Sequence, residues 1–126
     1  MTTAIFRPLT TEERSILDRM VEREFPGRDE VRAQLASVTA RTIDDDGSLE
    51  LRTSSATNAG VERRVPAEAW YVDDDGIVVN LLLHVLQGKV RELEIYKDDS
   101  SPIRKVPAAE TLDFTPRYDE KGRARA

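Results

Sequence analysis

The chain contains no cysteine and only one histidine. The absence of cysteine excludes disulfides, thiol catalysis and cysteine-ligated metals. The longest apolar run, Ile77 to Leu86, is interrupted by Asn80 and His84 and is shorter than the roughly 18 residues needed to cross a bilayer. The N-terminus lacks the basic start and apolar block of a signal peptide, so none is expected. We therefore expect a cytoplasmic bacterial protein that does not bind membranes.

Basic residues are also fewer than acidic ones: the chain has 19 lysines and arginines against 24 aspartates and glutamates, so the net charge is −5. From Arg117 onward the chain carries four basic and two acidic residues, which leaves a charge of −7 on the preceding body. An acidic body argues against a nucleic-acid partner, because phosphate binding needs clustered lysine and arginine. It permits a basic protein partner, although solubility is the simpler explanation.

The length of 126 residues suits a single domain. We assign residues 1–115 to this domain. Residues 116–126 are rich in basic side chains and have nothing apolar to bury near their end, so we expect a disordered basic tail.

Two helices are predicted near the N-terminus. Thr10 and Glu13 have the spacing of a capping box. Apolar residues then recur at helical spacing, at Ile16, Leu17, Met20 and Val21. This pattern predicts an amphipathic helix of about fifteen residues that Pro26 and Gly27 end. Asp29 is the expected cap of a second, shorter helix, whose buried side holds Val31, Leu35 and Val38.

The centre of the chain, from Tyr71 to Tyr96, predicts an antiparallel meander. Two short turns join three extended runs, and the first turn is the sequence Asp-Asp-Asp-Gly at 73–76. The second turn is Gln-Gly-Lys at 87–89. Val90 falls out of step with the following apolar residues, so we expect a β-bulge near Arg91.

A hairpin should precede the meander, with residues 38–43 and 48–52 as its strands. Residues 53–60 are small and polar without periodicity, which makes them the best candidate for a mobile loop. The whole pattern predicts an α+β fold in which two N-terminal helices pack on an antiparallel meander sheet of about five strands.

The two faces of the long run at 77–86 differ in character. One face is aliphatic and should meet the helices; it consists of Val79, Leu81, Leu83 and Val85. The other face is mixed and consists of Val78, Asn80, Leu82, His84 and Leu86. We expect this mixed face to be partly solvated, or to be covered by a loop or a partner.

No catalytic, metal or cofactor site is predicted. Consecutive aspartates in a turn point in different directions and converge poorly on one ion, whereas the turn itself explains both Asp and Gly. His84 would need a partner to orient it as a general base. Glu92 or Glu94 could lie across the hairpin from it, but a lone histidine on a half-buried strand is more often structural.

The candidate binding residues form an acidic surface with an aromatic anchor. Its acidic members are Asp73, Asp74, Asp75, Glu92, Glu94, Asp98 and Asp99. Trp70 and Tyr71 are adjacent in a strand, so one should enter the core and the other should reach the surface as a candidate anchor. The plainer interpretation of the glutamates is a solvated strand that is kept charged against edge-to-edge pairing.

Two runs carry a resemblance to known proteins: Y-V-D-D-D-G-I-V-V-N-L from Tyr71, and G-K-V-R-E-L-E-I-Y-K-D-D-S-S-P-I from Gly88. With the start R-x-L-T-x-x-E from Arg7, they resemble a family of small bacterial domains of unknown function, over residues 7 to about 105. The second run is also similar to immunity-type proteins of bacterial toxin systems, in which small acidic α+β domains neutralise a toxin. The resemblance implies a fold class and supplies no catalytic residues.

Three functional hypotheses follow. The first is a non-enzymatic module that binds a basic protein, of which an immunity-like protein is one form. The alternative is a small-molecule binding or minor catalytic domain, with a pocket between the first helix and the mixed strand face near His84. Asn80, Trp70 and Tyr71 would line that pocket. The third is a homodimer formed through the long sheet.

Overall fold

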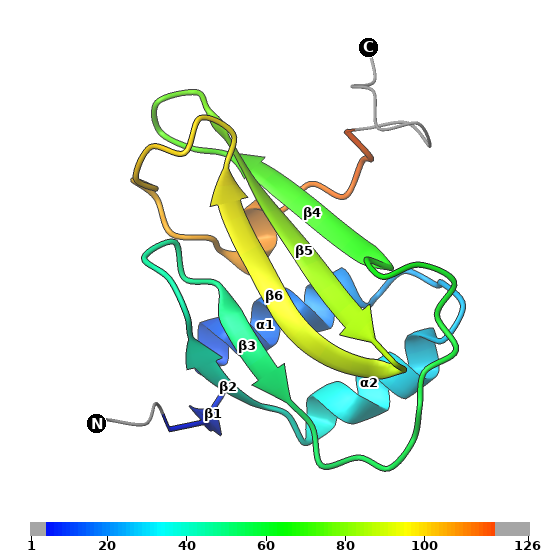
Figure 1. Ribbon diagram of the computed structural model, residues 1–126. Helices are drawn as coiled ribbons and strands as arrows, with labels where there is room; N and C mark the ends of the chain where they lie inside the picture. Colours follow the sequence, from blue (N-terminus) through cyan, green and yellow to red (C-terminus); the bar gives the residue numbers. More distant parts are fainter. Residues whose placement is uncertain (1–4, 118–126) are drawn as a thin grey trace.

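The computed structural model describes residues 5–117, and within them two α-helices pack against one antiparallel sheet of six strands (Figure 1). The helices are α1 (Thr11–Met20) and α2 (Arg28–Ala36), and a short 3-10 helix, η1 (Ala109–Thr111), lies near the C-terminus. The strands are β1 (Arg7–Pro8), β2 (Thr39–Thr42), β3 (Leu49–Arg52), β4 (Ala67–Val72), β5 (Val78–Leu86) and β6 (Lys89–Lys97). No helix in this part of the chain is long and apolar enough to span a membrane.

The predicted α+β class is confirmed, but the sheet has six strands instead of about five. Its order is β1-β2-β3-β6-β5-β4. The additional strand is β1, which pairs Arg7 with Ala40 and Pro8 with Thr39. A strand of two residues is too short to show a period in the sequence.

The meander β4-β5-β6 forms as predicted, with the bulge in the expected place. His84 pairs with Glu92, whereas the next residue, Val85, pairs with Val90. Arg91 is therefore the additional residue on β6. The first turn is tight because Gly76 takes a φ of +84°, in the left-handed region that favours glycine.

Both helices lie on the same face of the sheet, behind it in Figure 1. The aliphatic side chains of β5 face them and are almost completely buried, as predicted; these are Val79, Leu81, Leu83 and Val85. The opposite face of β4, β5 and β6 carries no helix. We call it the open face.

The helix ends differ from the prediction in two places. The capping box at Thr10 and Glu13 is confirmed, because each backbone N–H donates to the side chain of the other residue. However, α1 has ten residues rather than fifteen. The Arg28 guanidinium binds two carbonyl oxygens just beyond its end, at 3.1 and 3.2 Å. The start of α2 is set by Gly27, with φ +87°, and not by an Asp29 cap. A Cβ at Gly27 would lie 3.1 Å from the backbone of residue 60, so the chain needs glycine there.

A buried ammonium group joins β6 to the β4–β5 turn. Lys97 is 1% exposed, and its Nζ donates to Asp73 Oδ2 at 2.8 Å, Asp75 Oδ2 at 2.6 Å and the Pro102 carbonyl at 3.2 Å. The Asp73 carboxylate also accepts backbone N–H groups from Asp74, Arg104 and Lys105. One ion cluster therefore joins the β4–β5 turn, the end of β6 and the segment that follows β6.

Burial alone would raise the pKa of Asp73. The backbone N–H of Arg104, the Lys97 ammonium and the other backbone donors outweigh burial, so this pKa lies well below its usual range. For Lys97, burial would lower the pKa, but hydrogen bonds from its ammonium to the two aspartates raise it. Both groups are therefore charged in the folded protein.

The loop at 53–60, predicted to be mobile, is anchored by Gln34. This side chain is fully buried, and its Nε2 donates to the carbonyl oxygens of Thr57 at 2.8 Å and Gly88 at 2.7 Å. Its Oε1 accepts the N–H of Val90 at 2.9 Å. The loop is thus tied to both α2 and the β5–β6 turn.

We expect Lys97→Met to destabilise the protein strongly at pH 7, because Asp73 and Asp75 would lose their buried cation. Asp73 has a depressed pKa when folded, so its contribution is present above its unfolded pKa of about 3.9 and is lost as the pH falls below it. Urea unfolding should therefore show a deficit at pH 7 that narrows at pH 3. Lys105→Met, a change at an exposed lysine, is the control and should have little effect. An equal effect of the two substitutions would contradict this account.

Gln34→Leu should lower the free energy of unfolding by about 3 kcal/mol, because two carbonyls and one N–H would lose their buried partner. Hydrogen exchange should accelerate at residues 57–60 before global unfolding. Unchanged exchange there would show that Gln34 does not hold the loop.

Candidate functional site

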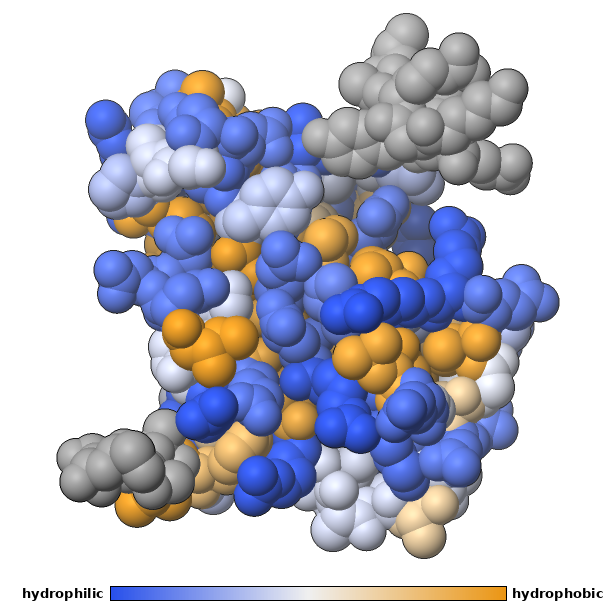
Figure 2. Space-filling model, viewed as in Figure 1, coloured by the Kyte–Doolittle hydropathy of each residue, from blue (hydrophilic) through white to orange (hydrophobic). Residues whose placement is uncertain are grey.

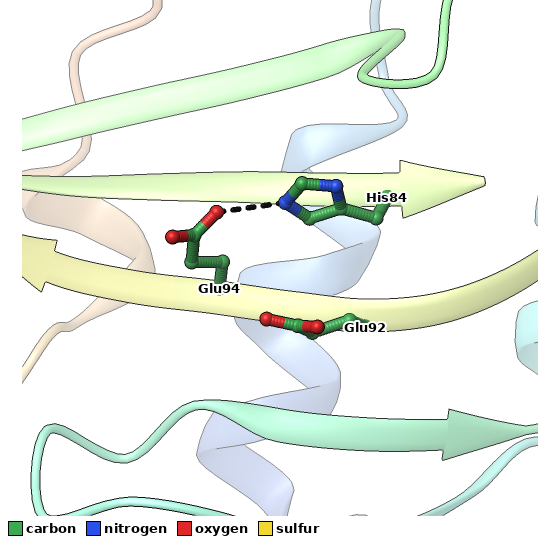
Figure 3. A group of neighbouring side chains, drawn as sticks. All are labelled: His84, Glu92 and Glu94. Carbon is green, nitrogen blue, oxygen red and sulfur yellow. Dashed lines mark hydrogen bonds and ion pairs between the residues drawn. The ribbon is translucent and has the colours of Figure 1, made fainter. Parts of the chain in front are cut away.

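The open face combines charged, aromatic and aliphatic side chains, and no helix of residues 5–117 lies over it. Figure 2 views the molecule from this side and shows hydrophilic residues interspersed with hydrophobic ones. In the middle of the sheet the strand pairing brings together His84 of β5 with Glu92 and Glu94 of β6 (Figure 3). We call these three residues the His84 cluster.

His84 is held between a cation and a carboxylate. Its Nε2 lies 2.8 Å from Glu94 Oε1, and its Nδ1 accepts a hydrogen bond from Arg64 Nε at 3.0 Å. Arginine can only donate, so Nδ1 must carry a lone pair and the ring proton sits on Nε2, directed at Glu94. The His84 side chain is 13% exposed. The prediction that a glutamate lies across the hairpin from His84 is confirmed.

Glu92 lies beside this chain of contacts and takes no part in it. In the strand register, Glu92 lies opposite His84 of β5 on one side and opposite Glu50 of β3 on the other. Glu50 has its own cation, Arg41, whose Nε lies 2.6 Å away. Within residues 5–117 we find no hydrogen bond or ion pair made by the half-buried Glu92 side chain.

The His84 cluster has the atom types of a metal site but the wrong surroundings. One ligand atom from each residue lies within 4.8 Å of the others, and histidine nitrogen with carboxylate oxygen suits zinc. A metal-bound histidine, however, usually donates its second N–H to an acceptor. Here Arg64 occupies that position and can only donate. Coordination through Nε2 would place two N–H groups against each other, so the geometry does not favour a metal.

The cluster also lacks the parts of a nucleophilic site. Among the described residues, His84 makes its side-chain hydrogen bonds to Arg64 and Glu94, and none to a hydroxyl group. A histidine that activates a nucleophile must contact it. What the arrangement offers instead is two neighbouring carboxylates on the open face, of which Glu94 is held by His84.

The aromatic pair behaves as predicted. Tyr71 enters the core at 3% exposed, and Trp70 lies on the open face. The Trp70 indole N–H donates to the Thr115 carbonyl at 2.8 Å, and the Arg117 guanidinium lies 6.0 Å from its ring. The C-terminal segment therefore covers part of Trp70, which reduces its value as an anchor for a partner.

Arg117 belongs to the folded body rather than to the predicted disordered tail. It pairs with Asp98 at 2.8 Å and donates to Asn80 Oδ1 at 2.7 Å. The Arg117 hydrogen bond lowers the pKa of the Asp98 carboxyl. The rest of the predicted tail, residues 118–126, lies outside the described residues.

The structure divides the predicted acidic surface. Asp73 is 3% exposed and Asp75 is paired with Lys97, so these two carboxylates are not available to a partner, whereas Asp74 is exposed. The expectation of a fully exposed aspartate turn was wrong because Lys97 lies on the helix-facing side of β6, where it requires buried carboxylates. In the sequence, Lys97 continues the alternation of Leu93 and Ile95, which indicates that Lys97 lies on the same buried side of β6. Glu92 and Glu94 do lie on the open face.

Residues 5–117 form no pocket between the first helix and the mixed strand face, because both helices lie on the other face of the sheet. Tyr71 does not share a face with Asn80 and His84. The hollow that Trp70 and Asn80 line has a volume of about 20 Å³, enough for a single water molecule but not for a ligand.

Residues 6–107 match the family described as Domain of unknown function (DUF6984). No curated protein and no solved structure matches the chain. The match covers every strand of the sheet and the whole His84 cluster. It confirms the predicted resemblance as far as a small domain of unknown function, and this chain belongs to the DUF6984 family.

Proposed function

We propose that this protein is a non-enzymatic binding module whose open face receives a cationic segment of a basic protein. The observation that carries the proposal is Glu92. Its side chain is half-buried, but its oxygens reach the surface, because no buried side-chain oxygen in residues 5–117 lacks a hydrogen bond. Glu50 directly opposite adds like-charge repulsion. An arginine or lysine side chain from a partner would supply the missing positive charge.

The surroundings of Glu92 suit such a contact. Leu82 and Leu86 lie on the same face of β5 and are half-buried, so they offer apolar surface to the stem of a long cationic side chain. The hydrogen bond from His84 fixes Glu94 in place before a partner arrives. Acceptors that are already ordered lose little entropy on binding.

The overall charge supports the same partner. The net charge of −5 would attract a basic protein over a distance and speed the encounter. An immunity-like role, with a toxin as the basic partner, is one form of this proposal and rests on the sequence resemblance alone. A cytoplasmic setting fits it.

A second copy of the chain suits the open face less well. A symmetric dimer through this surface would bring the region of Glu92, Glu94 and Glu50 against its own copy. Like charges would then be buried together, which costs free energy.

Glu92→Gln should raise the free energy of unfolding by about 0.2–1 kcal/mol, because it removes repulsion from Glu50 without breaking a contact. Glu50→Gln is the matched comparison and should not stabilise, since it also breaks the pair with Arg41. Urea unfolding at low salt measures both. A loss of stability in Glu92→Gln would mean that Glu92 has a structural partner, and the proposal would lose its main support.

Binding is tested with Glu92→Lys against Glu22→Lys, the same charge change at an exposed residue just after α1. Each protein is used as bait in lysate of the source organism, and bound proteins are identified by mass spectrometry. We expect one stoichiometric basic protein on the wild type and on Glu22→Lys, released by salt and absent from Glu92→Lys. Equal capture by all three would place the binding surface elsewhere, and self-association of the wild type alone in sedimentation would identify a second copy as the occupant.

A further inference from the structure

We propose that a cleft beside the start of β4 binds a small organic anion, specifically a carboxylate with an apolar body. The cleft has a volume of about 310 Å³, at the small end of the roughly 300–1,000 Å³ typical of ligand sites. It lies between the residues that follow α1, the beginning of β4 and the segment at 114–116. Its apolar walls come from Met20, Phe25, Val65, Pro66 and Phe114.

Two arginines, Arg23 and Arg63, line the cleft. The Arg23 guanidinium lies 5.4 Å from the Phe114 ring and donates to the Phe114 carbonyl at 3.3 Å. Arg19 lies over the same ring at 5.5 Å. Stacking orients the Arg23 guanidinium and leaves most of its N–H donors unused. Arg63 lines the cleft as well, and we find no ion pair for it within residues 5–117.

Three acidic residues lie near these arginines, and within residues 5–117 none of them forms an ion pair with Arg23 or Arg63. Asp113 is near enough to Arg23 for their charges to attract, but its Oδ1 accepts the backbone N–H of Thr115. The Glu24 side chain is 90% exposed and lies 3.6 Å from Arg28. Glu68 lines the cleft as well, but it alternates with the buried Ala67 and Ala69 on β4, so its side chain leaves the strand on the side of the open face. The charged groups left to meet a ligand are therefore the guanidiniums of Arg23 and Arg63.

This combination defines the ligand. Guanidinium groups bind carboxylates through paired, charge-assisted hydrogen bonds. A planar apolar body would fit between Phe25 and Phe114, where aromatic rings pack well. The cleft does not include Glu92, Glu94 or His84, so the inference is independent of the proposed protein-binding role.

Benzoate is the probe, and benzamide is its uncharged counterpart of nearly the same shape. Titration of the full chain, followed by ¹H–¹⁵N correlation spectra, should give saturable shifts at residues around the cleft with benzoate only. Arg63→Gln and Arg23→Gln should each weaken benzoate binding about tenfold, the loss expected when one charge-assisted contact is removed. Arg32→Gln, an exposed arginine of α2, should leave the affinity unchanged.

Arg63→Gln is the decisive variant, because Arg63 is exposed and its loss should not disturb the fold. Equal binding of benzamide, or an equal loss of affinity in Arg32→Gln, would overturn the proposal. The absence of saturable shifts in the wild type would also overturn it.

Discussion

The buried ammonium of Lys97 is the interaction on which the arrangement of the sheet depends. It sits at the end of β6 and binds two aspartates of the β4–β5 turn. Asp73 then holds the backbone at 104–105. The meander strands β4, β5 and β6 are thereby fixed in relation to one another at one end. Of these, β5 carries His84 and β6 carries Glu92 and Glu94, and the bulge at Arg91 adjusts the register of β5 and β6 at the other end.

Polar and charged side chains are compensated differently on the two faces of the sheet, and our proposal rests on this difference. On the covered side the polar groups are matched, and no buried side-chain nitrogen or oxygen in the described part of the chain lacks a hydrogen bond. On the open face, hydrogen bonds join Arg64 to His84 and His84 to Glu94. Glu92 lies opposite Glu50 and has no ion pair within residues 5–117. Among the described residues, Glu92 makes no hydrogen bond or ion pair that stabilises the fold, and our proposal assigns it to binding.

Features that depend on local spacing could be predicted from the sequence. The capping box at Thr10, the meander, the bulge at Arg91 and a glutamate opposite His84 all follow from periods and turns. Contacts between distant segments could not, because no local pattern encodes them. They include the pairing of β3 with β6 and the approach of Arg64 to His84. The approach of Arg64 makes the His84 cluster unfavourable for a metal. The alternation of Lys97 with Leu93 and Ile95 places Lys97 on the buried side of β6, but the identity of its carboxylate partners depends on the fold.

The central claim is that Glu92 accepts a cation from a protein partner. The most direct measurement is the side-chain carboxyl ¹³C shift of Glu92, followed while a short arginine-rich peptide is added. The account predicts that Glu92 responds first and most strongly among the carboxylates, and that amides of β6 shift with it. A response centred on the exposed aspartates of the turns, with Glu92 unchanged, would contradict the account.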